Sequence, residues 1–379
     1  MALVLNEEQH MLKESAQGFL AEHGSLAELR KQRDAGSETG YADGLWGQMV
    51  EMGWAAILVP EAYGGLEFGH VGMGQIVEQS GRTLTASPLF ATAVLGVSAI
   101  NNAANEAQKT ELLSAIATGE ITTALAVDEK AHHAPAQISL AATRQGSNYS
   151  LNGTKCFVVD GSTADKLIVA ARTAGATGDE EGISLFVVDR NTAGVEVERV
   201  AVTDGRNYAN ISFTNVEVAQ EALLGEEGKG FVALTATLDI GNIYLSAELL
   251  GIAQESFDRT LQYLKERKQF GVLIGSFQAL QHRAADWWSE IELCKSVILK
   301  ALQSLDNSDK KVPALASIAK AKLSEVAELS TNEAIQMHGG IGMTDEYDIG
   351  FFIKRARPAQ TLFGDSSYHI DRFALLSGY

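Results

Sequence analysis

The spacing of apolar residues predicts helices in the first third of the chain. Between Leu5 and about Gly119 most apolar residues recur at helical intervals. Two such stripes are Met11, Ser15 and Phe19, and Leu45, Met49 and Met52. The helical pattern is interrupted by PEAYGGLEFGH, residues 60 to 70, where a proline and a Gly-Gly pair predict a loop. We therefore expect a helical N-terminal domain.

A series of short β-type runs begins at Ile121 and predicts a second domain. The runs are TTALAV, SLAAT, YSLNGTKCFVV, DKLIVAART, ISLFVVD, VEVERV and ANISFTNVEV. Turn residues such as Asn152-Gly153 separate them, which is typical of hairpins. Strand patterning stops near Leu224-Gly225, before the glycine-rich GEEGKG segment. The pattern indicates an antiparallel β domain of ordinary size.

Long helical patterns return after the glycine-rich segment. One covers residues 230 to 268, and a second enters at Ser276. The second has one apolar stripe, Leu280, Trp287, Ile291, Cys294 and Ile298. A third starts near Pro313, a favourable first-turn residue, and ends at His338-Gly339-Gly340. The predicted fold class is α+β, with a helical domain (1–120), an antiparallel β domain (121–225) and a four-helix-bundle-like domain (226–379).

Composition narrows the classes of partner. The chain of 379 residues is 46% hydrophobic and carries a formal net charge of −18, which repels nucleic acid and anionic lipid. Its two cysteines, Cys156 and Cys294, are far apart and have no metal-ligand spacing, so we expect neither a disulfide framework nor a metal site. The N-terminal segment differs from a secretory signal, and no run reaches the ~20 apolar residues of a membrane helix. We expect a soluble cytoplasmic protein.

Two C-terminal segments carry a family resemblance. ERKQFGVLIGSFQALQHRAADW, residues 266 to 287, resembles the signature of the acyl-CoA dehydrogenases, and QMHGGIGMTDEY, residues 336 to 347, resembles their second signature. The PEAYGG loop and the LNGTK segment match as well, so the resemblance covers nearly the whole chain. The ending TLFGDSSYHIDRFA resembles an "FGD" subgroup that includes the small subunit of pimeloyl-CoA dehydrogenase.

The resemblance implies a function and its partners. The expected reaction is FAD-dependent α,β-dehydrogenation of an acyl-CoA thioester to the trans-2-enoyl-CoA, with electron-transferring flavoprotein as acceptor. The expected assembly is a homotetramer, or a heterotetramer with a related subunit. The identity of the acyl group stays open, because an acyl pocket is lined by scattered apolar helix positions that have the same sequence pattern as a hydrophobic core.

The resemblance also assigns a cofactor role to six residues of the C-terminal domain. They are Arg267, Gln269, Phe270, Gln336, Gly339 and Gly340. A guanidinium offers forked, charge-assisted hydrogen bonds to a pyrophosphate, and a glycine loop lets backbone N–H groups come close. In the family this half of the site serves a flavin held mainly by a neighbouring subunit. Taken alone, Arg267 would be a solvated helix-end charge and the Gly339-Gly340 pair a plain helix cap.

The β domain matches the family less well. Where relatives have a Thr-Glu-Pro stretch followed by Gly-Ser-Asp, this chain has VDEKAHH, with Asp128 at the threonine position. Phe157 replaces a flavin-stacking tryptophan, and Val159 replaces a threonine. Backbone amides of Val127 and Val159 are expected flavin donors. The alternative is that this segment is a solvated strand connection, in which loop histidines have no function.

Counting back from Arg372 places Asp365 where relatives keep their catalytic glutamate. A desolvated carboxylate suits removal of the α proton, because burial raises its pKa. Asp before Ser-Ser is also a helix N-cap signature, so capping is the alternative for Asp365. The other glutamate position of the family is occupied by Gly241, and its arginine neighbour by Asn242. The resemblance also places Ser367 among the cofactor contacts.

Two further functions stay open at this stage. The first is a flavin-poor structural subunit that completes the site of a catalytic partner in a heteromeric acyl-CoA dehydrogenase. The altered Asp128 segment beside the retained Arg267 and Gln336 motivates it. The second is an acidic helical scaffold in which the motifs no longer have a function.

Overall fold

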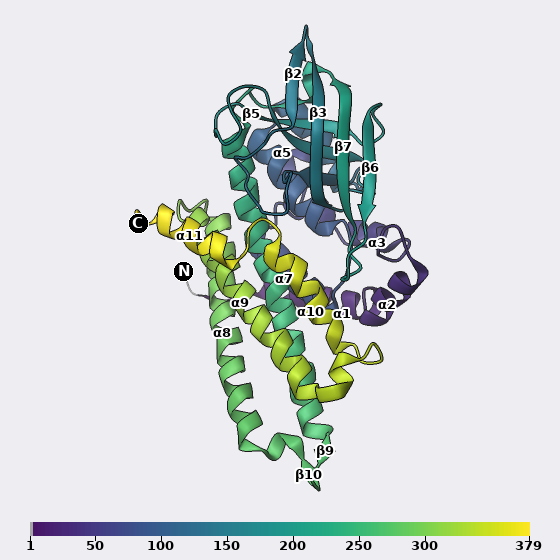
Figure 1. The fold of residues 1–379 in the computed structure, drawn as a ribbon, viewed down its shortest axis with the longest axis vertical. Helices are drawn as coiled ribbons and strands as arrows, with labels where there is room; N and C mark the ends of the chain where they lie inside the picture. The colour runs from purple at the N-terminus through teal and green to yellow at the C-terminus, as the bar shows by residue number, and fades with distance from the viewer. Residues whose placement is uncertain (1–2) are drawn as a thin grey trace. The chain divides into compact units, whose positions relative to one another are not determined.

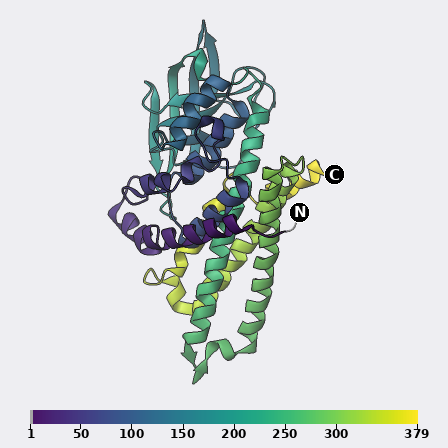
Figure 2. The ribbon, with the colours of Figure 1, turned by 180° about the vertical axis from the view of Figure 1, so that it is seen from behind.

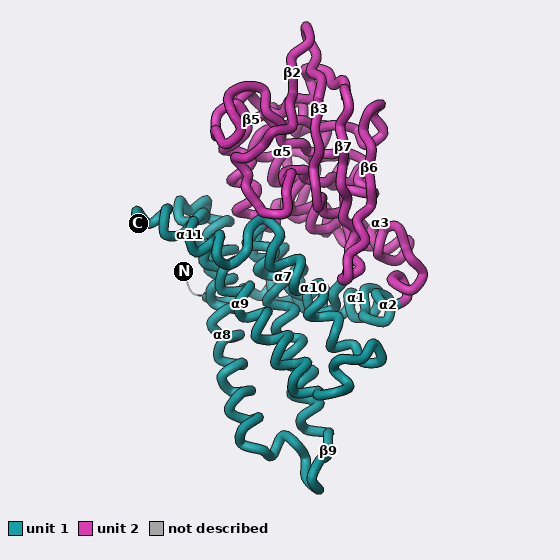
Figure 3. The backbone as a smooth tube through the Cα atoms, viewed as in Figure 1, with its two compact units in different colours: residues 1–30, 70–85, 242–379 teal, residues 31–69, 86–241 magenta. Residues whose placement is uncertain are grey.

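The computed structural model describes residues 3–379; residues 1 and 2, which fall in the predicted N-terminal domain, lie outside them. The chain forms two compact units (Figure 3). Unit 1 contains residues 1–30, 70–85 and 242–379, and unit 2 contains residues 31–69 and 86–241. The predicted fold class is confirmed: an N-terminal helical part, a middle β part and a C-terminal helical part follow one another (Figure 1).

Unit 1 is helical. Its helices are α1 (Glu7–His23), α4 (His70–Thr83), most of α7 (Gly230–Glu266), α8 (Gln278–Asp306), α9 (Val312–His338), α10 (Ile349–Thr361) and α11 (Ser366–Leu376). Short 3-10 turns are η5 (Ile274–Ser276) and η6 (Gly339–Met343), and a small hairpin is formed by β9 (Lys268–Gln269) and β10 (Val272–Leu273). The predicted helix that starts near Pro313 is confirmed, because α9 has this proline in its first turn and ends at Gly339.

A tryptophan joins the three longest helices of unit 1. Trp287 of α8 packs edge to face on Phe257 of α7, with ring centroids 5.0 Å apart. Its indole Nε1 donates to Ser330 Oγ of α9 at 2.7 Å, so the polar end of the buried ring is satisfied. Ile291, Cys294 and Ile298 of the predicted α8 stripe are buried with it. The core of the bundle is therefore built on the predicted face of α8.

The first predicted apolar stripe lies on the wrong face of its helix. In α1 Met11 and Ser15 are exposed, whereas Ala16 and Leu20 are fully buried. Side chains at Met11 and Leu20 are both apolar, so the sequence pattern alone allowed either face. Packing of α1 on α4 selects the face that carries Ala16 and Leu20.

Unit 2 combines short helices with one mixed sheet. The helices are α2 (Leu26–Ala35, which enters from unit 1), α3 (Leu45–Glu51), the π-helix η3 (Leu89–Gly96), α5 (Val97–Ala103) and α6 (Glu106–Ala117), with 3-10 turns η1 (Trp54–Ala56), η2 (Glu61–Tyr63) and η4 (Gln220–Ala222). The strands are β1 (Thr123–Ala126), β2 (Ala141–Gln145), β3 (Asn148–Val159), β4 (Lys166–Arg172), β5 (Ile183–Asp189), β6 (Val195–Val200), β7 (Tyr208–Val218) and β8 (Leu223–Leu224).

The expectation of an antiparallel sheet is wrong at strand β4, which pairs in parallel with β1 and, at Ala141 opposite Arg172, with β2. The order is β6-β7-β3-β2-β4-β5-β8, and β1 pairs with β4 in parallel, with Thr123 opposite Lys166 and Ala126 opposite Val169. All four residues of β1 are buried, which is typical of a parallel strand covered on both faces. An apolar run does not reveal the direction of its partner, so the sequence could not separate the two cases.

The helix η3 packs against this parallel strand, and the blue helices of unit 2 lie in front of the sheet when it is seen from behind (Figure 2). Thr92 Oγ1 accepts a hydrogen bond from the Thr123 amide at 2.9 Å and donates to the Thr123 carbonyl at 3.3 Å. The buried backbone amide and carbonyl of Thr123 therefore both have a partner. Within residues 3–379, none of the helices combines the length and the apolar character that crossing a bilayer requires.

Candidate active site

Three of the predicted cofactor residues lie on the hairpin between α7 and α8. Arg267 follows the last residue of α7, Gln269 belongs to β9, and Phe270 lies in the turn. Phe270 and Gly271 have φ of 54° and 81°, which gives a tight two-residue hairpin turn. All three side chains are exposed, and Phe270 is exposed to 92%. The hairpin therefore presents a cation, an amide and an aromatic ring outward.

The other three predicted cofactor residues of unit 1 lie at the C-terminal end of α9. Gln336 is exposed, and its carbonyl accepts the Gly339 amide, which closes the helix. Gly339 has a φ of 64°, and an added Cβ at Gly339 or Gly340 would meet no atom within 4 Å. The loop is thus both a helix cap, as its sequence allows, and an open stretch of backbone.

Two rings connect the end of α7 to the end of α9. Tyr263 stacks on His338, with ring centroids 4.3 Å apart, and the Tyr263 carbonyl accepts the Arg267 amide at 2.9 Å. His338 Nδ1 bonds to the Ala334 carbonyl at 2.7 Å, whereas its buried Nε2 has no hydrogen-bond partner in the described chain. Burial lowers the pKa of His338 and thus favours the neutral ring. The structure therefore brings the predicted hairpin and glycine-loop residues to one end of the bundle, through rings that the sequence analysis did not single out.

Asp365 lies at the N-terminus of α11. Its Oδ1 accepts the Tyr368 amide at 2.9 Å, so the capping role is present. Asp365 is exposed in the single chain, as is Ser367 in the first turn of α11. The desolvation that was expected to prepare a base is therefore not supplied by this chain's own residues around Asp365.

The Asp365 segment and the glycine loop lie far apart along α9. Lys320 of α9 bonds to the Gly364 carbonyl at 2.8 Å, which places Asp365 next to that part of the helix. Sixteen residues separate Lys320 from Gln336, and at 1.5 Å rise per residue this is about 24 Å. The predicted residues of unit 1 therefore form two groups, one at each end of this distance.

The four predicted cofactor residues of the β domain belong to unit 2, and the Asp128 carboxylate is paired there. His133 Nδ1 lies 2.9 and 3.0 Å from the two carboxylate oxygens of Asp128, and the side chain of His133 is only 4% exposed. The expectation of a solvated segment is therefore wrong for the His133 side chain, whereas His132 is exposed. The charge at Asp128 has a partner five residues away, which the spacing alone did not reveal.

A buried ion pair shapes the same segment. Lys155 of the LNGTK motif is fully buried, and its Nζ donates to the Val127 carbonyl at 2.8 Å and to Glu129 Oε1 at 2.9 Å. Glu129 also accepts the Leu140 amide at 2.9 Å. Burial acts to raise the pKa of Glu129, but the Lys155 charge and the hydrogen bonds outweigh it and leave that pKa lowered. The sequence analysis assigned no role to Lys155 or Glu129, although a lysine inside an apolar strand run is a signal for a buried partner.

An irregularity in β3 turns Phe157 outward. The pairing of β3 with β7 shifts register between Lys155 and Val158, and Phe157 has a φ of 51°. Bulges of this kind re-aim a side chain and are common beside active sites. Phe157 is 47% exposed, whereas Val127 and Val159 are buried in the sheet core. The predicted stacking residue is therefore available, and the two valines offer only backbone atoms.

The donor set fits an aromatic dinucleotide. In unit 1, the ring of Phe270 is 92% exposed, and Arg267 is an exposed cation on the same hairpin. The backbone at Gly339 and Gly340 is open to close approach. A flavin ring stacks on aromatic surface and a pyrophosphate needs cations and N–H groups, so the residues of unit 1 offer chemistry that suits both parts of FAD. No group of three or more metal-ligating side chains occurs among residues 3–379.

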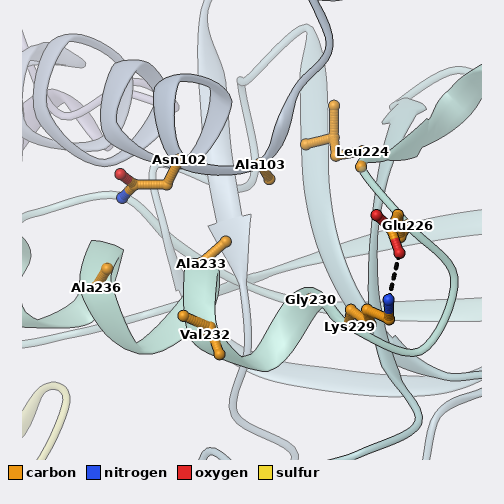
Figure 4. A pocket seen from close by; sticks show the side chains of 10 residues that line it. Asn102, Ala103, Leu224, Glu226, Lys229, Gly230, Val232, Ala233 and Ala236 are labelled. Carbon is orange, nitrogen blue, oxygen red and sulfur yellow. Dashed lines mark hydrogen bonds and ion pairs between the residues drawn. The ribbon is translucent and has the colours of Figure 1, made fainter.

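Two pockets of unit 2 lie apart from the predicted residues. A pocket of about 370 Å³ is lined by residues from the end of α5 and the start of α7, including Asn102, Leu224 and Val232 (Figure 4). A larger one of about 960 Å³ is lined by acidic residues such as Asp179 and Glu181 and by Phe231. No predicted site residue lines either pocket.

Three family models match the chain: the N-terminal domain of acyl-CoA dehydrogenases over residues 6–120, the middle domain over 124–216 and the C-terminal domain over 228–374. The chain therefore belongs to the acyl-CoA dehydrogenase family of oxidoreductases.

Individual relatives agree with this family. The probable acyl-CoA dehydrogenase YngJ of Bacillus subtilis (strain 168) is 32% identical over 99% of this chain and 98% of its own length. Cyclohex-1-ene-1-carbonyl-CoA dehydrogenase of Geobacter metallireducens is 33% identical over 83% of this chain and 84% of its own length. The solved structure of butyryl-CoA dehydrogenase from Megasphaera elsdenii superposes with a TM-score of 0.92 at 27% identity, covering 99% of this chain and 100% of that chain.

Proposed function

We propose that this protein binds FAD and dehydrogenates an acyl-CoA thioester to the trans-2-enoyl-CoA. The observation that carries the proposal is the exposed set at one end of unit 1, which consists of Arg267, Phe270 and the open backbone of Gly339-Gly340. They lie in the segments that resemble the family's two signatures, within the matched C-terminal domain. An aromatic ring beside a cation, both left open to solvent, suits a dinucleotide better than it suits a folded core.

The proposed reaction needs a base and a hydride acceptor. FAD, when bound, supplies the hydride acceptor. The Asp365 carboxylate takes the proton from the α carbon, the β carbon loses a hydride, and the remaining electron pair forms the C=C bond. Electron-transferring flavoprotein then removes the two electrons from the enzyme. Asp365 must be covered in the working assembly, because a solvated carboxylate is a weak base at neutral pH.

The working assembly is proposed to be a homotetramer or a heterotetramer with a related subunit. The distance of about 24 Å between the Asp365 segment and Gln336 along α9 supports sites that are completed by a neighbour. The hairpin surface, formed by Phe270, Val272, Leu273 and Phe277, supports the same inference, since each of these apolar side chains is at least 38% exposed. Light scattering on the flavin-loaded protein tests it. An active, flavin-loaded monomer would contradict shared sites.

A flavin-poor subunit of a heteromeric acyl-CoA dehydrogenase is the second candidate. It is favoured by the Asp128–His133 pair, which stands where relatives keep a threonine, and by the "FGD" ending that resembles the pimeloyl-CoA dehydrogenase small subunit. The colour of the purified protein separates the two candidates. A yellow homomer supports the first, whereas a colourless chain that gains flavin only with a related subunit supports the second.

The test of the reaction is anaerobic mixing of the yellow protein with a panel of acyl-CoA thioesters. Straight-chain, branched, dicarboxylic, aromatic and steroid acyl groups cover the substrate classes, and an artificial electron acceptor allows turnover. Bleaching of the flavin absorbance by at least one thioester, with enoyl-CoA as product, is the expected result. A flavin-loaded protein that none of the thioesters bleaches would refute the proposed activity.

A further inference from the structure

Lys320 is a buried lysine that serves only backbone carbonyls. It lies on α9 and is fully buried among helices of unit 1. Its Nζ lies 3.2 Å from the Gln360 carbonyl, 2.6 Å from that of Leu362 and 2.8 Å from that of Gly364. The protonated amine has three N–H donors and the neutral amine has two, so the three carbonyls satisfy every donor in either state. The lysine thus binds the end of α10 and the segment that leads to α11.

The segment that Lys320 holds is a strained turn. Phe363 has a φ of 57°, a left-handed conformation that a bulky side chain disfavours, and Gly364 has a φ of 105°. A Cβ at Gly364 would lie 2.3 Å from Cδ1 of Tyr368, so this position accepts only glycine without movement. Conformations of this kind persist only when surrounding contacts impose them, and they concentrate at functional sites.

Side chains from two other helices complete the hold on this turn. The Phe363 carbonyl lies 3.1 Å from His369 Nε2 of α11 and accepts from Asn242 Nδ2 of α7 at 3.4 Å. The carbonyls of Leu362, Phe363 and Gly364 therefore all face polar side chains in the interior. The next residue is Asp365, whose backbone and carboxylate start α11. The direction in which Asp365 leaves the turn is set by these contacts.

A chain that needed only a helix end at this place would not require a buried lysine. Burying an amine costs free energy unless every donor is satisfied, and an apolar side chain of similar length fills the same volume without that cost. Lys320 therefore has to be explained by what it holds. We propose that Lys320 is a positioning residue of the dehydrogenase, which fixes the Phe363-Gly364 turn and thereby the placement of Asp365. This inference rests on the proposed function, because Asp365 is the proposed base.

The test compares Lys320→Met with Lys322→Met. Lys322 lies on the same helix, but its Nζ pairs with Glu290 of α8, so this control loses a lysine without touching the turn. Flavin content, the dissociation constant for acyl-CoA and the rate constant of flavin bleaching at saturating acyl-CoA are measured for both. Lys320→Met is expected to slow bleaching by about 10- to 100-fold, since small misplacements of a reacting group cost up to this much in rate. Lys322→Met is expected to bleach at the wild-type rate.

Several outcomes separate positioning from a plain structural role. If flavin-loaded Lys320→Met bleaches at the wild-type rate and only melts earlier, Lys320 is a core residue and the inference is overturned. The Tyr368 amide donates a hydrogen bond to the Asp365 carboxylate, so its hydrogen-exchange rate reports how firmly the turn is held, without any substrate. Faster exchange in Lys320→Met, with unchanged exchange in Lys322→Met, supports the tether, and unchanged exchange in both overturns it.

Two remaining cases are also decided by this design. If Lys320→Met does not fold, Lys320→Gln replaces it, because the amide keeps two donors on a shorter side chain and should recover part of the bleaching rate. Wild-type protein that binds flavin but is bleached by no acyl-CoA would refute the proposed function itself. In that case the turn would have no role in dehydrogenation. The hydrogen-exchange experiment would still show whether Lys320 holds the turn.

Discussion

Asp365→Asn separates the two roles of Asp365 most directly. The carboxylate accepts a hydrogen bond from the Tyr368 amide at 2.9 Å, and this bond caps α11. Asn and Asp are nearly equal as N-caps, so Asp365→Asn should unfold at the wild-type denaturant concentration. Asp365→Ala loses the cap and should be less stable by about 0.5–2 kcal/mol.

The effect on the reaction should follow a different order. Neither asparagine nor alanine accepts a proton from the α carbon, and a positioned general base contributes about 10²- to 10⁴-fold to a rate. Each decade is about 1.4 kcal/mol of activation free energy, so the loss is about 2.7–5.4 kcal/mol for both variants. The two substitutions therefore differ in stability and agree in rate, which a structural cap alone cannot produce.

Stopped-flow mixing with the best acyl-CoA of the panel measures the rate, and urea unfolding measures the stability. The expected Asp365→Asn protein is folded, yellow and able to bind acyl-CoA, but its flavin is not bleached within the wild-type time. Asp365→Glu should keep partial activity, because the carboxylate remains with one more methylene. Bleaching of Asp365→Asn at the wild-type rate would show that the base lies elsewhere and that Asp365 only caps α11.

Three further predictions follow from other contacts. Arg267→Ala should bind flavin ten- to a hundredfold more weakly, because a charge-assisted hydrogen bond is worth about 1.5–3 kcal/mol. The neighbouring Lys268→Ala should keep its flavin on dialysis. Equal retention of flavin by both variants would contradict a phosphate contact of Arg267. Lys155→Met should lower the free energy of unfolding by about 3–5 kcal/mol in urea, since it leaves Glu129 buried without its cation, and a loss under 1 kcal/mol would refute this. Burial lowers the pKa of Lys320 from 10.5 to about 7, so between these pH values the unfolded chain binds more protons than the folded chain. The free energy of unfolding of the wild type should therefore increase relative to that of Lys320→Met as pH rises. A difference between the two proteins that does not change from pH 6.5 to 9.5 would contradict this prediction.

Local patterns were sufficient where neighbouring residues decide the structure. Helix α9 begins at its first-turn proline and ends at Gly339, because ring geometry and glycine freedom act within one turn of the chain. The short β-type runs became strands for the same reason, since alternation and turn residues act over a few positions. Each family signature is a continuous stretch of sequence, so the resemblance at residues 266–287 and 336–347 could be recognised without the structure.

Contacts between residues distant in sequence were beyond such patterns. The parallel pairing of β1 with β4 and the choice of the Ala16–Leu20 face of α1 depend on partners that hydrophobic spacing does not identify. The bulge that exposes Phe157 arises from register with β7, not from the residues of β3 alone.

The same division applies to the candidate site. The sequence by itself determined which residue types are present: the cation at 267, the glycines at 339 and 340, and a carboxylate at 365. Only the tertiary structure decided that Lys155 forms an ion pair with Glu129 and that Lys320 holds a turn forty residues away. A buried charge is stable only where folding brings it complete partners, and those partners come from other helices and strands. Residue chemistry is therefore a property of the sequence, whereas its placement and solvation are properties of the fold.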